Sequence, residues 1–187
     1  MVERKGDAFE LGAQLTVVGA KLGVGVEAPD FELDHLVPAS DALETIRLRE
    51  SAGHVRVLNV INSLDTPVCQ IETRRWDAEL LGISSGVELF TISMDLPFAQ
   101  ARWCAAENAR HAALSAHREE DFGRNYGVLI KEWRLLQRAV FVVGGEGRIE
   151  HAEYVADQMA EPDYDAAITV VRRLLGSGVT NRAMTSG

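Results

Sequence analysis

Two cysteines are the residues of this 187-residue chain best suited to covalent chemistry. Cys69 directly follows Asp65-Thr66-Pro67-Val68, where a strand pattern gives way to a helix pattern. Thr66 suits the N-cap of this helix and Pro67 its first position, because proline has no N–H to leave unsatisfied there. Cys69 then lies in the first helical turn, where free N–H groups and the helix dipole stabilise an anion. Since a thiolate is the nucleophilic form of cysteine, Cys69 is a candidate reactive thiolate.

The other candidate residues each have an ordinary structural interpretation beside the chemical one. The Thr66 hydroxyl either caps the helix by accepting from the backbone N–H of Cys69 or turns toward the sulfur and a bound substrate. Cys104 lies within a helical pattern, where a cysteine is commonly a small buried hydrophobic residue, and the same alternative applies to Cys69. Arg138 opens an apolar strand, a position where an arginine is ordinarily a surface charge. These alternatives remain open on the residues alone.

Composition indicates one globular domain spanning residues 1–187. The chain has a mass of 20.5 kDa, 47% hydrophobic and 25% charged residues, and a pI near 5.0. A net charge of −9 disfavours nucleic acid and anionic membrane as partners, because either calls for a clustered basic face. Residues 1–7 lead into no apolar run, and nowhere are about eighteen consecutive residues apolar. We therefore expect a cytoplasmic protein whose partners are small molecules or proteins.

Cysteine and histidine usage favours redox chemistry over metal binding. In a reducing compartment, two isolated cysteines are more readily explained by catalysis than by a permanent disulfide. Neither cysteine belongs to a metal-type pair, and the five histidines show no ligand spacing. We expect no metal and no cofactor.

The hydrophobic pattern alternates between strands and helices along most of the chain. Short strands are expected at 9–18 and 31–33, as an N-terminal β extension covering residues 8–33. Beyond Gly176 we expect a flexible tail at 177–187. In between, the pattern predicts strands at 54–61, 87–94, 112–115, 138–143 and 148–155, and helices at 67–81, 96–108, 119–126 and 163–175.

This element order predicts an α/β protein with a thioredoxin-like fold, in which helices flank a central mixed sheet. In that fold, the loop after the first core strand often carries a redox-active C-x-x-C motif. Here the same position reads Thr66-Pro67-Val68-Cys69. Without a local dithiol, the chain is poorly suited to reducing protein disulfides, but its single sulfur can still attack an oxidant.

Two segments of the sequence resemble the bacterial thiol peroxidases, which are atypical two-cysteine peroxiredoxins. Residues 63–69, SLDTPVC, with 72–75, ETRR, are similar to the active-site segment of this family. Residues 91–100, TISMDLPFAQ, running into Arg102-Trp103-Cys104, resemble its resolving-cysteine segment. Weaker similarity occurs at 28–31, 126–128, 138–143 and 161–165, so that the resemblance spans about residues 9–175.

The resemblance implies a role for each candidate residue. Cys69 would be the peroxidatic cysteine, Cys104 the resolving cysteine, Thr66 the hydroxyl of the T-x-x-C pocket and Arg138 the active-site arginine. The implied substrates are hydrogen peroxide and organic hydroperoxides, the implied reductant is thioredoxin, and the implied assembly is a homodimer. The family pattern P-x-x-x-T-x-x-C is broken at one position, because Asn62 occupies the place of the proline.

The expected reaction joins both thiols. Cys69 attacks a hydroperoxide to give a sulfenic acid, and Cys104 condenses with it to an intrachain disulfide. Because the cysteines are expected on different helices, we predict a local rearrangement at each turnover. The alternatives are a peroxide-responsive sensor or chaperone on the same fold with weak turnover, or a noncatalytic protein with a structural disulfide. Asn62 either adds a hydrogen bond to the pocket or loosens its wall.

Overall fold

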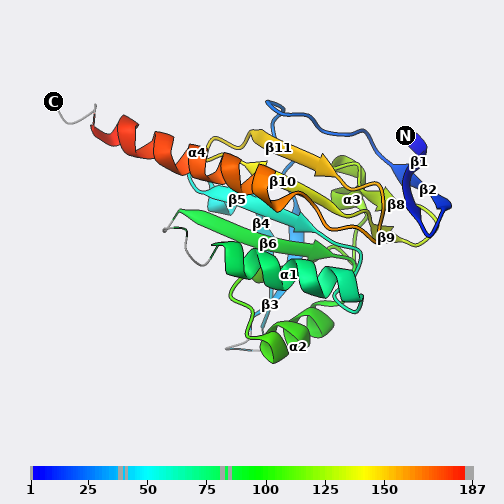
Figure 1. The fold of residues 1–187 in the computed structure, drawn as a ribbon. Helices are drawn as coiled ribbons and strands as arrows, with labels where there is room; N and C mark the ends of the chain where they lie inside the picture. Colours follow the sequence, from blue (N-terminus) through cyan, green and yellow to red (C-terminus); the bar gives the residue numbers. More distant parts are fainter. Residues whose placement is uncertain (1, 38–39, 41, 81–82, 84–85, 184–187) are drawn as a thin grey trace.

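A seven-stranded sheet forms the centre of the computed structural model (Figure 1). Its strands lie in the order β11-β10-β5-β6-β7-β3-β4, with β5, β6 and β7 parallel and the outer strands antiparallel to their neighbours. The structure describes all residues except 1, 38–39, 41, 81–82, 84–85 and 184–187, and leaves the side chains of 177–183 undescribed. The strand order and directions, with helices against the sheet, confirm the mixed sheet flanked by helices that the sequence predicts (Figure 1).

The described residues form eleven strands, one 3₁₀ helix and four α-helices. The strands are β1 (Glu3–Glu10), β2 (Ala13–Val18), β3 (Glu32–Val37), β4 (Ala42–Arg47), β5 (Val55–Val60), β6 (Val87–Ser93), β7 (Ala112–Ser115), β8 (Leu129–Ile130), β9 (Leu135–Leu136), β10 (Ala139–Val143) and β11 (Ile149–Tyr154). The helices are η1 (Leu48–Ser51), α1 (Pro67–Leu80), α2 (Pro97–Glu107), α3 (Asp121–Asn125) and α4 (Tyr164–Ala183).

The central strands are buried on both faces, which explains their continuous apolar sequences. Val57 on β5 and Val142 on β10 belong to the cluster under α1 and α4, together with Trp76. Alternate residues, such as Leu58 and Phe141, point to the opposite face, into the cluster that includes residues of α3. α2 packs against β7 and β3, near the α1 side of the sheet (Figure 1). The N-terminal end of α1 is thus held at the carboxyl end of β5.

The N-terminal β extension is a hairpin rather than one strand. The sequence predicts a single strand at 9–18, but β1 and β2 pair in antiparallel fashion around Leu11 and Gly12, which both have positive φ angles. Gly12 allows this turn without strain. The hairpin joins β8 and β9 in a separate four-stranded sheet. The expected strand at 31–33 instead extends over β3 and belongs to the large sheet, paired with β7 and β4.

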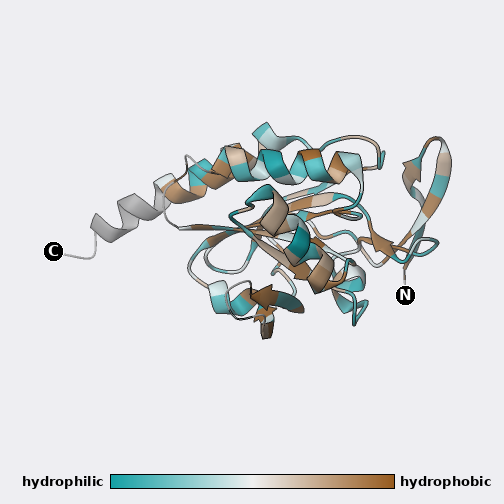
Figure 2. Cartoon of the chain, turned by 90° about the horizontal axis from the view of Figure 1, so that it is seen from below, coloured by the Kyte–Doolittle hydropathy of each residue, from teal (hydrophilic) through white to brown (hydrophobic). Residues whose placement is uncertain are grey.

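The C-terminal helix is longer than predicted. α4 continues past Gly176 to Ala183, whereas the sequence predicts its end at 175. Its described part alternates hydrophilic and hydrophobic residues, as expected for a helix with one face on the sheet (Figure 2). The last part of the predicted tail, 184–187, lies outside the described residues.

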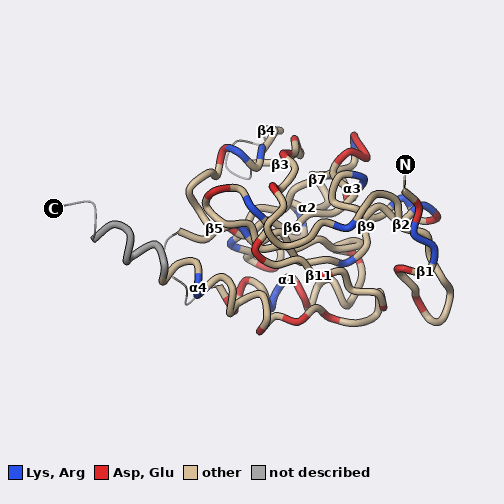
Figure 3. The backbone as a smooth tube through the Cα atoms, turned by 90° about the horizontal axis from the view of Figure 1, so that it is seen from above, with Lys and Arg blue, Asp and Glu red and all other residues tan. Residues whose placement is uncertain are grey.

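Charged side chains are dispersed over the described chain. Lys and Arg are interspersed with Asp and Glu along the loops and helices (Figure 3). Within the described residues, no helix combines the length and the apolar character that crossing a membrane requires.

Candidate active site

Cys69 is the third residue of α1, and its side chain is completely buried. The helix begins at Pro67, as the start signals predict. Around the thiol lie Ile61 and Leu64 from the loop after β5, with Trp103 of α2 packed against this cluster. The sulfur therefore lies beside the N-terminus of a helix in an apolar setting, where a nearby positive charge has a strong effect.

The loop before α1 is fixed by Asp95, at the end of β6. One Asp95 carboxylate oxygen accepts from the Ser63 hydroxyl at 2.7 Å, and the other accepts from the backbone N–H of Leu64 at 2.8 Å. The Thr66 hydroxyl donates to the backbone carbonyl of Ser63 at 3.0 Å. Thr66 therefore stabilises the loop in this state, in place of either arrangement expected from the sequence.

Arg138, the residue directly before β10, reaches the thiol of Cys69. Its Nη1 lies 3.5 Å from the Cys69 sulfur, and its side chain is only 1% exposed, which is incompatible with a surface charge at a strand end. Nη2 donates to the backbone carbonyl of Gln158 at 2.9 Å, and Nη1 also forms an ion pair with Glu72. Burial alone lowers the pKa of Arg138, but its contacts with Glu72 and Cys69, which favour the charged guanidinium whenever those groups are ionised, outweigh burial and raise it. The guanidinium is therefore a fixed positive charge beside the sulfur.

Glu72 competes with the thiol for this charge. It lies one helical turn after Cys69 on the same face of α1 and is completely buried. Burial raises the pKa of Glu72 to about 8, against the lowering effect of Arg138. A carboxyl group that keeps its proton near neutral pH leaves the single guanidinium charge to a Cys69 thiolate.

Asn62, at the position of the family proline, is part of the hydrogen-bond network that holds Arg138. Its Nδ2 donates to the backbone carbonyl of Leu136 at 2.6 Å and to Oε1 of Gln158 at 3.0 Å. Oε1 of Gln158 also accepts from the backbone N–H of Arg138 at 2.9 Å, and Arg138 Nη2 lies 3.5 Å from Oδ1 of Asn62. Of the two possible effects of Asn62, the structure shows added hydrogen bonds.

Cys104 lies apart from this network, in the last turn of α2. It is half-buried and lines a cavity of about 390 Å³ between α2, β3 and β7. Burial and the nearby charge of Asp77 raise the pKa of its thiol to about 11. Both cysteines are free thiols. The structure thus brings Arg138 to Cys69, turns Thr66 toward Ser63 and leaves Cys104 in a cavity of its own.

The sequence analysis assigns no role to two residues of the site, Glu72 and Gln158, and only Glu72 carries a signal that indicates one. Glu72 is three residues after Cys69, a spacing that places both on one helix face. Its polarity on a buried face indicates a buried partner. Gln158 lies in a connection without periodicity, and no local pattern indicates that it contacts Asn62.

This arrangement defines a class of protein: a thioredoxin-like fold that holds one buried thiol beside a guanidinium. The model of the AhpC/TSA family matches residues 24–152. Thiol peroxidase from Streptococcus gordonii is 46% identical over 165 residues, which cover 88% of this chain and 98% of that protein. Thiol peroxidase from Oceanobacillus iheyensis is 47% identical over 156 residues, covering 83% and 92% of the two chains.

Solved structures support the same classification. A peroxiredoxin-like protein from Aquifex aeolicus superposes with a TM-score of 0.82 at 33% identity, covering 91% of this chain and 97% of that one. Thiol peroxidase from Chromobacterium violaceum, at 21% identity and a TM-score of 0.79 over 92% of this chain and 98% of its own, has the same fold. The expected thioredoxin-like fold is confirmed. The chain belongs to the AhpC/TSA family and is a thiol-dependent peroxidase.

Proposed function

We propose that Cys69 is the peroxidatic cysteine and that Arg138 and Thr66 assist it in reducing hydrogen peroxide and organic hydroperoxides. The observation that carries this proposal is the 3.5 Å contact between Arg138 Nη1 and the Cys69 sulfur in a buried pocket. The thiolate attacks the terminal peroxide oxygen and the O–O bond breaks; the leaving oxygen takes up the proton that the thiol released to solvent on ionising, and departs as water or an alcohol. Cys69 is left as a sulfenic acid.

Arg138 and the start of α1 stabilise the charge that develops during this step. In the transition state, negative charge spreads over the sulfur and both oxygens, and prearranged donors stabilise such charge by about 3–4 kcal/mol each. Arg138 supplies N–H donors that stay protonated, and α1 supplies backbone N–H groups. The Thr66 hydroxyl donates to the Ser63 carbonyl in this structure, and we propose that rotation of the side chain turns it to the bound peroxide.

We further propose that Cys104 resolves the sulfenic acid by forming an intrachain disulfide. Cys69 packs against Trp103, whereas Cys104 lines the cavity beside β3 and β7, and we propose that the segment around Cys104 moves to bring the two sulfurs together. This movement has to bring the Cα atoms of Cys69 and Cys104 within about 7 Å of each other, the largest separation that a disulfide tolerates. We propose that thioredoxin reduces the disulfide, that the working unit is a homodimer and that the protein acts in the cytoplasm.

The test is a coupled assay with matched cysteine variants. Peroxide-dependent consumption of NADPH through thioredoxin reductase and thioredoxin is measured for the wild type, Cys69→Ser and Cys104→Ser. We expect turnover by the wild type only. Cys104→Ser should still consume about one equivalent of peroxide and retain a sulfenic acid, detected with a dimedone probe and mass spectrometry.

Two outcomes would change the proposal. Peroxide consumption that persists in Cys69→Ser would exclude Cys69 as the peroxidatic residue. Slow turnover with stoichiometric Cys69–Cys104 disulfide formation would instead favour a peroxide sensor.

A further inference from the structure

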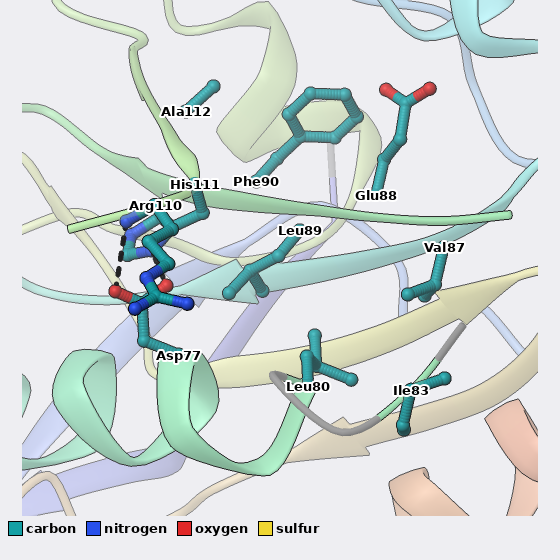
Figure 4. Close-up of a pocket in the computed structure, with 10 residues that line it drawn as sticks. All are labelled: Asp77, Leu80, Ile83, Val87, Glu88, Leu89, Phe90, Arg110, His111 and Ala112. Carbon is teal, nitrogen blue, oxygen red and sulfur yellow. Dashed lines mark hydrogen bonds and ion pairs between the residues drawn. The ribbon is translucent and has the colours of Figure 1, made fainter. Parts of the chain in front are cut away.

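Asp77 and His111 form a partly buried pair at the cavity that Cys104 lines. Asp77, on α1, accepts from the backbone N–H of Arg110 at 3.0 Å and lies 2.7 Å from Nδ1 of His111 (Figure 4). Burial opposes ionisation of Asp77, but the hydrogen bonds that it accepts from His111 and from the backbone N–H of Arg110 outweigh burial and lower its pKa. The ionised carboxylate can only accept, so Nδ1 carries the hydrogen.

This hydrogen bond fixes the tautomer of His111. With the hydrogen on Nδ1, the neutral imidazole presents a bare lone pair on Nε2. The His111 side chain is 3% exposed, and Nε2 has no hydrogen-bond partner among the residues that the structure describes. A buried polar atom without a partner is unusual and calls for a functional explanation.

The cavity lined by Cys104 is also lined by His111, as is a second cavity beside α1 and β6. The charge of Asp77 acts on the Cys104 thiol, so the carboxylate, the imidazole and the thiol lie in one neighbourhood. The ionisable groups around His111 in the two cavities are Asp77 from α1, Glu88 from β6, His35 from β3, Cys104 from α2 and the adjacent Arg110.

We propose that His111 is the base that deprotonates Cys104 for disulfide formation, and that Asp77 is the residue that positions it. This inference rests on the proposed role of Cys104 in resolving the Cys69 sulfenic acid. An acidic residue that orients a histidine beside a nucleophile is the general arrangement for activating a weak nucleophile. The buried thiol needs such help, because its pKa of about 11 leaves it protonated near neutral pH.

The step balances without any further reactant. Within the cavity that both residues line, the Cys104 thiol gives its proton to Nε2 of His111. The Cys104 thiolate attacks the sulfenic sulfur of Cys69, the S–S bond forms and the S–O bond breaks. The Cys104 sulfur is oxidised and the Cys69 sulfur is reduced, while the expelled hydroxide and the proton released by His111 form water.

The test is a single-turnover reaction of the full, reduced chain with hydrogen peroxide, followed by Trp103 fluorescence in a stopped-flow instrument. The first phase, sulfenic acid formation, depends on peroxide concentration, and the second, disulfide formation, does not. His111→Asn is the variant of choice, because the asparagine amide can keep the hydrogen bond to Asp77 while Nε2 is removed. His35→Asn is the matched control, since His35 lines the same cavity and its Nδ1 lies 3.0 Å from the backbone carbonyl oxygen of Ala113.

We expect His111→Asn to leave the first phase unchanged and to slow the second by about 100-fold at neutral pH, within the usual range for a general base. Because hydroxide then replaces the lost base, the deficit should shrink about tenfold per pH unit and nearly vanish about two units higher. Thermal unfolding of the variant checks that the fold is retained.

The inference is overturned if the second phase of His111→Asn keeps the wild-type rate. It is also overturned if the deficit is the same at every pH, as a purely structural role would give, or if His35→Asn is the slow variant. Each of these outcomes leaves the proposed function intact. By contrast, absence of the first phase in the wild type, or a second phase that persists in Cys104→Ser, would remove the proposed function and this inference with it.

Discussion

Asn62 offers a direct measure of what the polar network around Arg138 contributes to stability. Asn62→Leu keeps the branching of the side chain at Cγ and removes its two donated hydrogen bonds, to the carbonyl of Leu136 and to Oε1 of Gln158. Gln158 Oε1 keeps its bond from the Arg138 backbone, whereas Leu136 loses a donor in a buried position.

The expected cost follows from these contacts. A neutral buried hydrogen bond contributes about 1 kcal/mol net, and a buried group left unsatisfied costs about 1–3 kcal/mol. The variant should therefore lose about 2–4 kcal/mol of unfolding free energy. Arg138 keeps its bond to the Gln158 carbonyl at 2.9 Å, so its position changes little. We expect the rate of the peroxide step to fall by less than about tenfold, roughly 1.4 kcal/mol.

Urea unfolding under reducing conditions, combined with a double-mutant cycle, tests this reasoning. Asn62→Leu and Gln158→Leu remove the same hydrogen bond. The sum of the unfolding free energies lost by the two single variants should therefore exceed the loss in the double variant by about 1 kcal/mol. Asn59→Leu is the matched control: Asn59 is also buried but bonds to Thr91, and its cycle with Gln158 should be additive.

A loss below about 0.5 kcal/mol for Asn62→Leu, the usual range for a change without structural consequence, would refute the network as a source of stability. Equal coupling of Gln158 to Asn59 and Asn62 would show that the cycle measures something other than their shared bond. Asn62→Pro removes the same donors, and we expect a comparable loss from it.

Three further predictions concern the groups around the two thiols. Because burial raises the pKa of Glu72 from 4.5 to about 8, the folded chain keeps a proton that the unfolded chain loses above about pH 4.5, so the free energy of unfolding should fall as the pH rises from about 4.5 to about 8. Glu72→Gln should flatten this pH dependence, measured by urea unfolding at several pH values. An unchanged slope would contradict the assignment. Thr66→Val removes the hydroxyl that donates to the Ser63 carbonyl and should slow the peroxide step by about 100-fold, measured by stopped flow. Thr66→Ser keeps a hydroxyl and should restore the rate. Equal rates for the two variants would exclude a role for the hydroxyl. Arg74 and Glu107 form an exposed ion pair between α1 and α2, with hydrogen bonds of 2.6 and 2.9 Å. Arg74→Met should loosen α2 and speed disulfide formation about two- to fivefold. An unchanged rate would show that this ion pair does not restrain α2.

The sequence predicts the central fold well because its strongest signals are local. The strand that becomes β5 is a continuous apolar run, and Thr66-Pro67 marks the start of α1 within one residue. The weakest predictions concern elements without such signals. β8 and β9 have two residues each, and their pairing with β2 depends on contacts far apart in the sequence.

The candidate site divides in the same way. Cys69 is predictable from its place at a helix start, a local feature. The partners of Arg138 are not, because Glu72 lies 66 and Gln158 20 residues away in the chain, and only the folded sheet brings them together. The hydroxyl of Thr66 also illustrates a limit, since its orientation toward Ser63 depends on a rotamer that the sequence does not specify.

Helix α1 links the two thiols mechanically. Cys69 and Asp77 lie eight residues apart, on one stripe of the helix, so its first turns carry the reactive sulfur and a later turn holds His111. Arg74 ties the same helix to α2. If α2 carries Cys104 to Cys69, the ion pair between Arg74 and Glu107 opens, and movement of the segment after α2 would also open the contacts of Asp77 with Arg110 and His111. Proton transfer to His111 should therefore come first, because the imidazole loses its fixed orientation once the contact with Asp77 opens.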